Sequence, residues 1–370
     1  SSVRLHIHHH VPPDMLVSAT DGYGLQSTFE FTKLSSPVVH TVGSGAVFPV
    51  RDLARPGFVV AKMVRDDSRG REEEAYFYVG ARLHAQGRGF LGFAKQRVED
   101  SRSGLVTYDH VARAFPLTGM LLRRVVTKYA ASTTLRTWTA ELGVQSLGAA
   151  GSERRSLPLV LRTNEQRHEL DGTLNGTVVS DDSHEFTYGD GFGNPTQVTR
   201  IVVDLDPTSP DYNQAWRSTT STVFANDSSG HWCLGLPVSS RAVITVPGQA
   251  LAVRSKSYGI NTIDCRITRE VIEPESAALR VTSDFGFDGC GNLSTLRVAG
   301  AAPDGAPLPA RTTTFHYGSR CQLPETTTNA RGEAATVAWR YDFGLPARET
   351  DANGLATNWT VGLPFLRTSV

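Results

Sequence analysis

Short runs of alternating polar and apolar residues recur along the chain, and each run follows a turn that contains glycine. The runs are rich in Thr, Val, Trp and Tyr, which is typical of half-buried β-strands. Near the C-terminus the same unit occurs twice. Thr328 to Gly332 precedes a run that ends at Asp342, and Thr350 to Gly354 precedes Ala356 to Thr360. This pattern predicts a series of β-hairpins.

The turns share a simple chemistry. An Asp or Asn two to four residues before glycine can cap a tight turn, and glycine accepts the positive φ that a Cβ opposes. Similar turns occur at Thr20 to Gly24, Gly189 to Asn194 and Phe287 to Asn292, with a weaker copy at Asp100 to Gly104. We expect positive φ at the turn glycines Gly24, Gly193, Gly291, Gly332 and Gly354. Because such a unit cannot bury its own face, the repeats predict an all-β array of stacked hairpins.

Helical signals are lacking, since no stretch of ten or more residues combines helical periodicity with caps at both ends. In the first half of the chain, Val59 to Val64 and Ala75 to Val79 predict a hairpin with the charged tip Arg65 to Glu74. The three glutamates in this tip are typical of a solvated loop.

A glycine pattern at Gln86 to Phe93 matches G-x-G-x-x-G. A dinucleotide site would need a helix to open at the last glycine, but only Ala94 to Glu99 separate it from the next turn. We therefore expect no cofactor here. The glycines should allow strands to approach closely while Phe90 and Phe93 pack together.

Composition narrows the possible partners. The 370 residues include 37 basic and 37 acidic side chains, and this balance argues against binding to nucleic acid or to an anionic membrane. No apolar run approaches the roughly 18 residues that span a bilayer. The chain opens on Ser1, as a fragment or a processed piece would. We expect two continuous regions, a β-rich region at 1–180 and the repeat strip at 181–370.

Candidate metal ligands and thiols are few. The cysteines Cys233, Cys265, Cys290 and Cys321 lack the close pairs of structural zinc sites, so we expect them buried in strands, although a secreted protein could pair two of them. The histidines His6, His8, His9 and His10 fit a tag remnant or a solvated strand end better than a metal site. Asp204, Asp206 and Asp211 could hold calcium but lack the full ligand ladder, which favours a capped turn.

No catalytic motif is present, because the chain contains no G-x-S-x-G elbow, no H-E-x-x-H and no P-loop. The sequence thus predicts no enzyme and no catalytic residue.

The sequence Tyr341-Asp342-Phe343-Gly344 and the run from Asp351 to Thr360 resemble the RHS/YD-repeat proteins, with Tyr341 and Trp359 as repeat aromatics. Three further stretches, Pro12 to Leu16, Gln86 to Phe93 and Trp232 to Pro237, resemble the region that leads into the RHS repeats of bacterial insecticidal toxin-complex B components and related plasmid virulence proteins. The resemblance covers the chain from about Val11 to Val370.

This resemblance implies a curved strip of antiparallel hairpins that forms part of a hollow, secreted shell. The shell would enclose and protect a toxic polypeptide for delivery. The implied partners are this polypeptide and other RHS-shell segments or toxin-complex subunits, without a cofactor, nucleic acid or membrane insertion. Self-cleavage is not implied, because no Asp-Pro-x-Gly-Leu element occurs. The end of the chain at Val361 to Arg367 breaks the repeat pattern, as a piece that stops mid-array would.

Two other functions remain open. A cell-surface or cell-wall-associated RHS protein would bind carbohydrate through exposed aromatic residues such as Trp138, Trp216 and Trp359. A β-helix enzyme that degrades polysaccharide would need paired carboxylates, for which Asp204 and Asp206 are the candidates.

Overall fold

The computed structural model describes residues 15–21, 25–54, 57–67, 70–129, 133–147, 155–362 and 366–369. Strands dominate these residues, and their one helix is the 3₁₀ turn at Gly172–Leu174. The prediction of an all-β protein is therefore confirmed. Within the same residues, no helix has the length and apolar character needed to cross a membrane.

The chain divides into two compact units. The N-terminal unit comprises Ser1–Asp181 with Leu205–Thr208, and the C-terminal unit comprises Asp182–Asp204 with Ser209–Val370. Strand β14 (Val178–Tyr188) runs across the change from one unit to the other.

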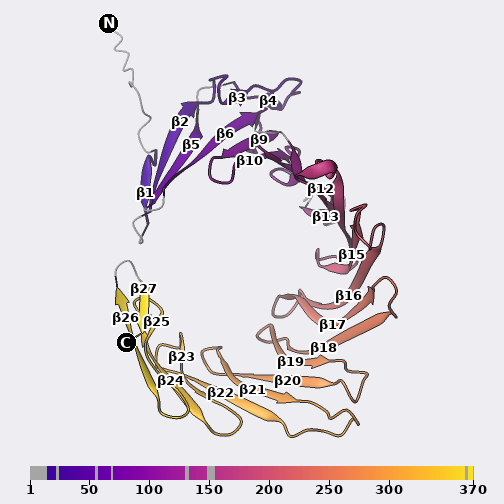
Figure 1. Ribbon diagram of the computed structural model, residues 1–370, viewed down its shortest axis with the longest axis vertical. Helices are drawn as coiled ribbons and strands as arrows, with labels where there is room; N and C mark the ends of the chain where they lie inside the picture. Colours follow the sequence, from indigo (N-terminus) through magenta and orange to yellow (C-terminus); the bar gives the residue numbers. More distant parts are fainter. Residues whose placement is uncertain are drawn as a thin grey trace. The chain divides into compact units, whose positions relative to one another are not determined.

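In the N-terminal unit, successive antiparallel neighbours form the main sheet (Figure 1). Their order is β1 (Ser18–Thr20), β2 (Gln26–Lys33), β5 (Phe58–Asp67), β6 (Gly70–Val79), β9 (Lys95–Asp100), β10 (Leu105–Val111), β11 (Leu121–Lys128), β12 (Thr134–Leu147) and β13 (Arg155–His168). Strand β3 (His40–Thr41) pairs in parallel with the end of β6. A separate small sheet contains β4 (Val50–Asp52), β7 (Arg82–His84) and β8 (Gly89–Gly92).

The glycine pattern near residue 90 lies in the β7–β8 hairpin. The turn precedes Gly89, and β9 begins at Lys95 without an intervening helix. Phe90 and Phe93 pack edge to face with ring centroids 5.4 Å apart, as expected from the sequence. Phe93 also contacts Tyr78, a buried residue of β6, at 4.5 Å between centroids. This segment is therefore an aromatic packing element of the N-terminal unit.

The prediction of a charged, solvated loop at residues 65–74 is wrong. Strand β5 extends to Asp67 and strand β6 begins at Gly70, so the three glutamates lie within β6. Glu72, Glu73 and Glu74 form ion pairs with Arg102, Lys62 and Arg65, respectively. Opposite charges on neighbouring strands stabilise a sheet face, which is why a charged run can continue a strand.

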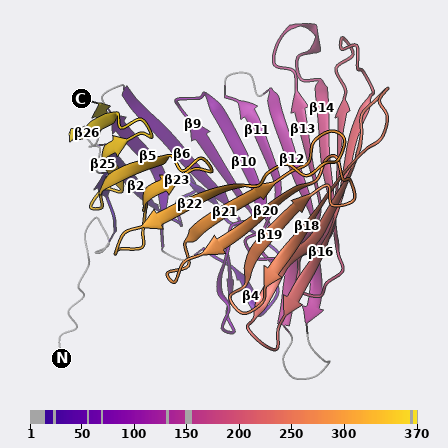
Figure 2. The ribbon, with the colours of Figure 1, turned by 90° about the horizontal axis from the view of Figure 1, so that it is seen from below.

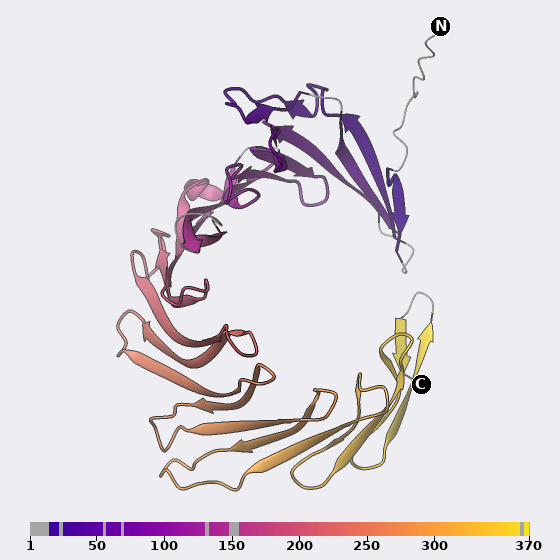
Figure 3. The same cartoon turned by 180° about the vertical axis from the view of Figure 1, so that it is seen from behind.

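The C-terminal unit is a series of antiparallel hairpins. Each strand pairs with the next one in sequence, as Figure 2 shows for β18 to β23 and Figure 3 shows from behind. The strands are β15 (Pro195–Asp204), β16 (Ala215–Asp227), β17 (Cys233–Thr245), β18 (Ala252–Asn261), β19 (Arg266–Ile272), β20 (Val281–Phe287), β21 (Leu293–Ala299), β22 (Arg311–Tyr317), β23 (Pro324–Thr328), β24 (Ala334–Arg340), β25 (Leu345–Thr350), β26 (Ala356–Gly362) and β27 (Leu366–Ser369).

Because direction reverses at every strand, the turns of this unit alternate between two rims. The name rim A is used here for the edge of the sheet that contains the turns β14–β15, β16–β17, β18–β19, β20–β21, β22–β23 and β24–β25. Rim B carries the turns between these hairpins.

Few side chains of the C-terminal unit are fully buried. Among its described residues, the apolar side chains in that class are Cys233 and Pro346, whereas the N-terminal unit buries residues such as Val64, Val106 and Val126. A single-layer sheet has no second layer against which to build a core. The hairpins of this unit must therefore be held together mainly by contacts within the sheet.

Candidate functional site at rim A of the C-terminal unit

The hydrogen-bond ladders of this unit are uneven. Within a hairpin the ladder reaches rim A, as in β20–β21, where Phe287 pairs with Leu293 beside the turn. Between hairpins it stops short of rim A. Strands β21 and β22 pair only over residues 295–298 and 311–314, and β17 pairs with β18 only from Ser239 onward. Among the described residues, these two seams between hairpins are thus paired through the backbone toward rim B but not at rim A.

β-Bulges lie close to rim A, where the ladders between hairpins stop. Each of four hairpins contains a register shift close to rim A, at residues 259/260, 286/287, 316/317 and 338/339. A bulge bends the strand and increases its local twist. The repeated bulges therefore turn the rim A end of each hairpin away from a regular ladder with its neighbour.

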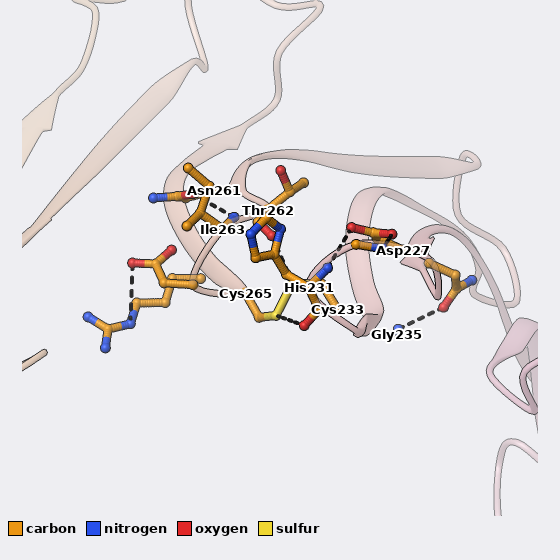
Figure 4. The surroundings of a disulfide bond; sticks show 12 residues. Asp227, His231, Cys233, Gly235, Asn261, Thr262, Ile263 and Cys265 are labelled. Carbon is orange, nitrogen blue, oxygen red and sulfur yellow. Dashed lines mark hydrogen bonds and ion pairs between the residues drawn. A yellow bond between two sulfur atoms is a disulfide. The ribbon is translucent and has the colours of Figure 1, made fainter.

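Two disulfide bonds span this gap. Cys233–Cys265 joins the β16–β17 hairpin to the β18–β19 turn, with Cα atoms 5.2 Å apart (Figure 4). The turn before Cys233 is fixed by Asp227, whose carboxylate accepts hydrogen bonds from the backbone N–H groups of Gly230 and His231. In the same way, Cys290–Cys321 joins the β20–β21 turn to the β22–β23 turn, with Cα atoms 6.2 Å apart.

The expectation that the cysteines are unpaired in strands was wrong. Cys233 is buried at the start of β17, but Cys265, Cys290 and Cys321 lie in turns. The partners are separated by 32 and 31 residues in the sequence, about the length of two strands with their turns. This spacing, close to one hairpin repeat, is the signal that could have identified the pairs.

Noncovalent contacts connect the remaining turns of rim A. Between the β18–β19 and β20–β21 turns, the guanidinium of Arg266 lies 4.9 Å from the centre of the Phe287 ring. Between the β14–β15 and β16–β17 turns, the Asn226 side chain donates a hydrogen bond to Asp190 at 3.1 Å and also contacts Asn194.

The last of these contacts involves the repeat aromatic Tyr341. The guanidinium of Arg320 lies 4.6 Å from its ring centre, and the Tyr341 hydroxyl donates to Glu325 at 2.8 Å. This hydrogen bond raises the pKa of Tyr341. Trp339 also reaches the neighbouring hairpin, because its Nε1–H donates to the Pro324 carbonyl at 2.8 Å. Every successive pair of rim A turns from β14–β15 to β24–β25 is therefore joined by a side chain.

The turn glycines adopt left-handed backbone conformations. Gly193, Gly291, Gly332 and Gly354 have φ values of 87°, 88°, 83° and 83°, and Gly24 lies outside the described residues. Three residues before each of these four glycines, an Asp or Asn side chain accepts N–H groups two and four residues further on, at Asp190, Asp288, Asn329 and Asp351. These hydrogen bonds, above all the one from Asn292 N–H, lower the pKa of Asp288. The same turn thus occurs on both rims.

The tryptophans expected to be exposed are not. Trp138, Trp216 and Trp359 are only partly exposed, whereas Trp232 is 68% exposed beside the first disulfide. Trp232 has a φ of 59°, which is unusual for a residue other than glycine.

The predicted acidic pair has local partners. Asp204 accepts a hydrogen bond from the Ser209 hydroxyl at 2.6 Å, and Asp206 accepts the N–H and hydroxyl of Thr208. The hydrogen bonds from Thr208 lower the pKa of Asp206. No group of three His, Cys, Asp or Glu residues that could hold a metal occurs in the described part of the chain, from which the histidines at 6–10 are left out. Both aspartates thus serve as turn caps.

Comparison with solved structures identifies the architecture. The crystal structure of TcdB2-TccC3 matches with a TM-score of 0.63 and 11% identity over 94% of this chain, and the structure without the hypervariable C-terminal region matches with 0.64 over 95%. The fold is that of part of an RHS-repeat shell. The holotoxin pore of the Photorhabdus luminescens Tc toxin matches with 0.64 and 12% identity.

The resemblance to insecticidal toxin-complex proteins is therefore confirmed at the level of the fold. This chain spans 24% of the length of the matched TcdB2-TccC3 chain, or about a quarter. No protein-family model and no curated protein matches the sequence.

Proposed function

We propose that this RHS-shell-like chain is a non-catalytic segment of a secreted wall that encloses a toxic polypeptide and protects it for delivery. The observation that carries the proposal is the continuous set of side-chain links along rim A. In a sheet without a core, these links join successive hairpins where the backbone ladder ends. A wall works by excluding water and proteases, which requires closed seams more than it requires any single reactive group.

The partners follow from the length of the chain. Because it spans about a quarter of the matched shells, other RHS-shell segments or toxin-complex subunits are needed to close the enclosure. The two disulfides fit export, since disulfides persist in oxidising compartments.

Removal of one repeat tests the proposal. The turns at 328–332 and 350–354 have the same sequence pattern, so deletion of residues 332–353 joins Arg331 to Gly354 and retains one complete turn while removing β24 and β25. In the assembled shell, this deletion should expose the enclosed polypeptide to added protease. Asp204→Ala and Asp206→Ala should leave it protected.

The opposite pattern contradicts the proposal. If an aspartate variant abolishes toxicity while the polypeptide stays protease-resistant, the chain has a chemical role. If the deletion leaves the polypeptide protected, the hairpins are not a wall around it.

A further inference from the structure

The two disulfides of rim A differ in their access to solvent. Cys233 is 2% exposed, and its partner Cys265 is half-buried. By contrast, Cys290 is exposed and Cys321 is half-buried. A thiolate must reach a sulfur atom in line to attack it, so the second disulfide is the more open to exchange.

Positive charge lies beside the exposed cysteine. The guanidinium of Arg266 reaches across the seam to Gly291, the residue after Cys290, so closely that a Cβ at Gly291 would collide with it. The carboxylate of Asp288 is on the same turn, but it accepts the N–H groups of Cys290 and Asn292. A nearby cation attracts the incoming thiolate anion, and it stabilises the Cys290 thiolate when that sulfur is released in the second exchange.

The second disulfide also closes a weak seam. Between β21 and β22 the ladder contains four residue pairs, all on the rim B side of Ser294. Nearer to rim A, the Asn292 side chain donates a hydrogen bond to the Cys321 carbonyl across this seam at 3.0 Å. Cleavage of Cys290–Cys321 would thus leave this end of the seam with little to hold it.

We propose that Cys290–Cys321 is a thiol–disulfide exchange site for small thiols, and that its reduction opens the β21–β22 seam at rim A while Cys233–Cys265 stays intact. An external thiolate attacks the Cys290 sulfur, the disulfide bond breaks, and Cys321 leaves as a thiolate that takes a proton from water. A second external thiol attacks the resulting mixed disulfide and releases Cys290. Two external thiols are oxidised to one disulfide, and the protein disulfide gains two electrons and two protons.

Any effect of this opening on an enclosed polypeptide rests on the proposed function, but the exchange itself is a property of the chain. The test therefore uses the isolated, oxidised, full-length chain and reduced glutathione as the probe. Samples are quenched with an alkylating agent over time, and each cysteine is quantified by peptide mass spectrometry. We expect Cys290 and Cys321 to be labelled at least about tenfold faster than Cys233 and Cys265. Equal rates, or faster labelling of Cys233 and Cys265, overturn the proposal.

A charge variant tests the part played by Arg266. Arg266→Gln should slow the reduction of Cys290–Cys321 several-fold and flatten its salt dependence, and Arg266→Lys should restore both. The wild-type chain under the same conditions is the control, because Arg266 directly follows Cys265 and its replacement can also affect Cys233–Cys265. An unchanged rate in the glutamine variant removes Arg266 from the site.

Hydrogen exchange reports whether the seam opens. After selective reduction, the amides of residues 295–298 and 311–314, whose ladder closes this seam, should exchange faster, while those of β16 should not change. If the seam residues keep their protection, the disulfide is an exchange site without a structural effect, and the opening is refuted. These results do not depend on an enclosed polypeptide, so they can fail or succeed separately from the proposed function.

Discussion

Two turn glycines differ in one respect that a substitution can measure. Gly291 and Gly332 have φ values of 88° and 83°, but a Cβ at Gly332 would meet nothing within 4 Å, whereas one at Gly291 would collide with Arg266. Gly332→Val should therefore cost on the order of 1–2 kcal/mol from the left-handed backbone alone. Gly291→Val must also displace Arg266 from the Phe287 ring, which should cost about 0.5–1 kcal/mol more.

Equilibrium unfolding in urea gives both values, and a second background isolates the contact. When Arg266→Ala is already present, the two valine substitutions should destabilise the protein equally, since the displaced group is gone. Equal costs in the wild-type background would show that the contact of Arg266 with Phe287 contributes nothing. An extra cost at Gly291 that persists without Arg266 would assign the difference to another cause.

Other positions offer simpler tests. Asp288→Ala should lower the urea midpoint of unfolding because it removes the turn cap. Asp288→Asn should destabilise the protein less than Asp288→Ala. Because the folded pKa of Asp288 is lowered, the ionised carboxylate stabilises the fold above its unfolded pKa of about 4, and this stabilisation is lost as the pH falls through the folded pKa. The difference in stability between Asp288→Asn and wild type should therefore vanish in acid. Trp339→Phe loses the hydrogen bond to Pro324 and should cost about 1 kcal/mol, so wild-type stability would contradict that link. Joint substitution of Cys233 and Cys265 by serine should cost about 3–4 kcal/mol for a loop of 32 residues, and an unchanged Tm in calorimetry would refute this.

The sequence predicted the strands and turns well because their chemistry is local. In the turn at 288–292, the capping Asp288 and the left-handed Gly291 lie within five consecutive residues, so the pattern is readable without knowledge of distant contacts. The same reasoning failed at residues 65–74. There, the ion pair between Lys62 and Glu73 stabilises a strand that the charges alone suggested was a loop.

Rim A could not be predicted in this way, because every link joins residues about one hairpin apart. Nothing within five residues of Arg266 indicates that it lies over Phe287, and single cysteines in separate turns look unpaired until the repeat length is known. The contacts emerge only when the hairpins are placed side by side. The separation of the paired cysteines by 32 and 31 residues matches the repeat and is the part of this information that the sequence contains.

Neighbouring hairpins are joined by backbone hydrogen bonds at rim B and by side chains at rim A. At rim B the pairing between hairpins, such as that of residues 295–298 with 311–314, uses main-chain groups and tolerates many sequences. At rim A the distance between neighbouring hairpins depends on the side chains that join them, which are a disulfide, an arginine over an aromatic ring or a pair of asparagines. Longer side-chain links at rim A would increase the distance between neighbouring hairpins there, and shorter links would decrease it, while the pairing at rim B stays the same. Substitutions confined to one edge could therefore adjust curvature over evolution without altering a single strand pairing.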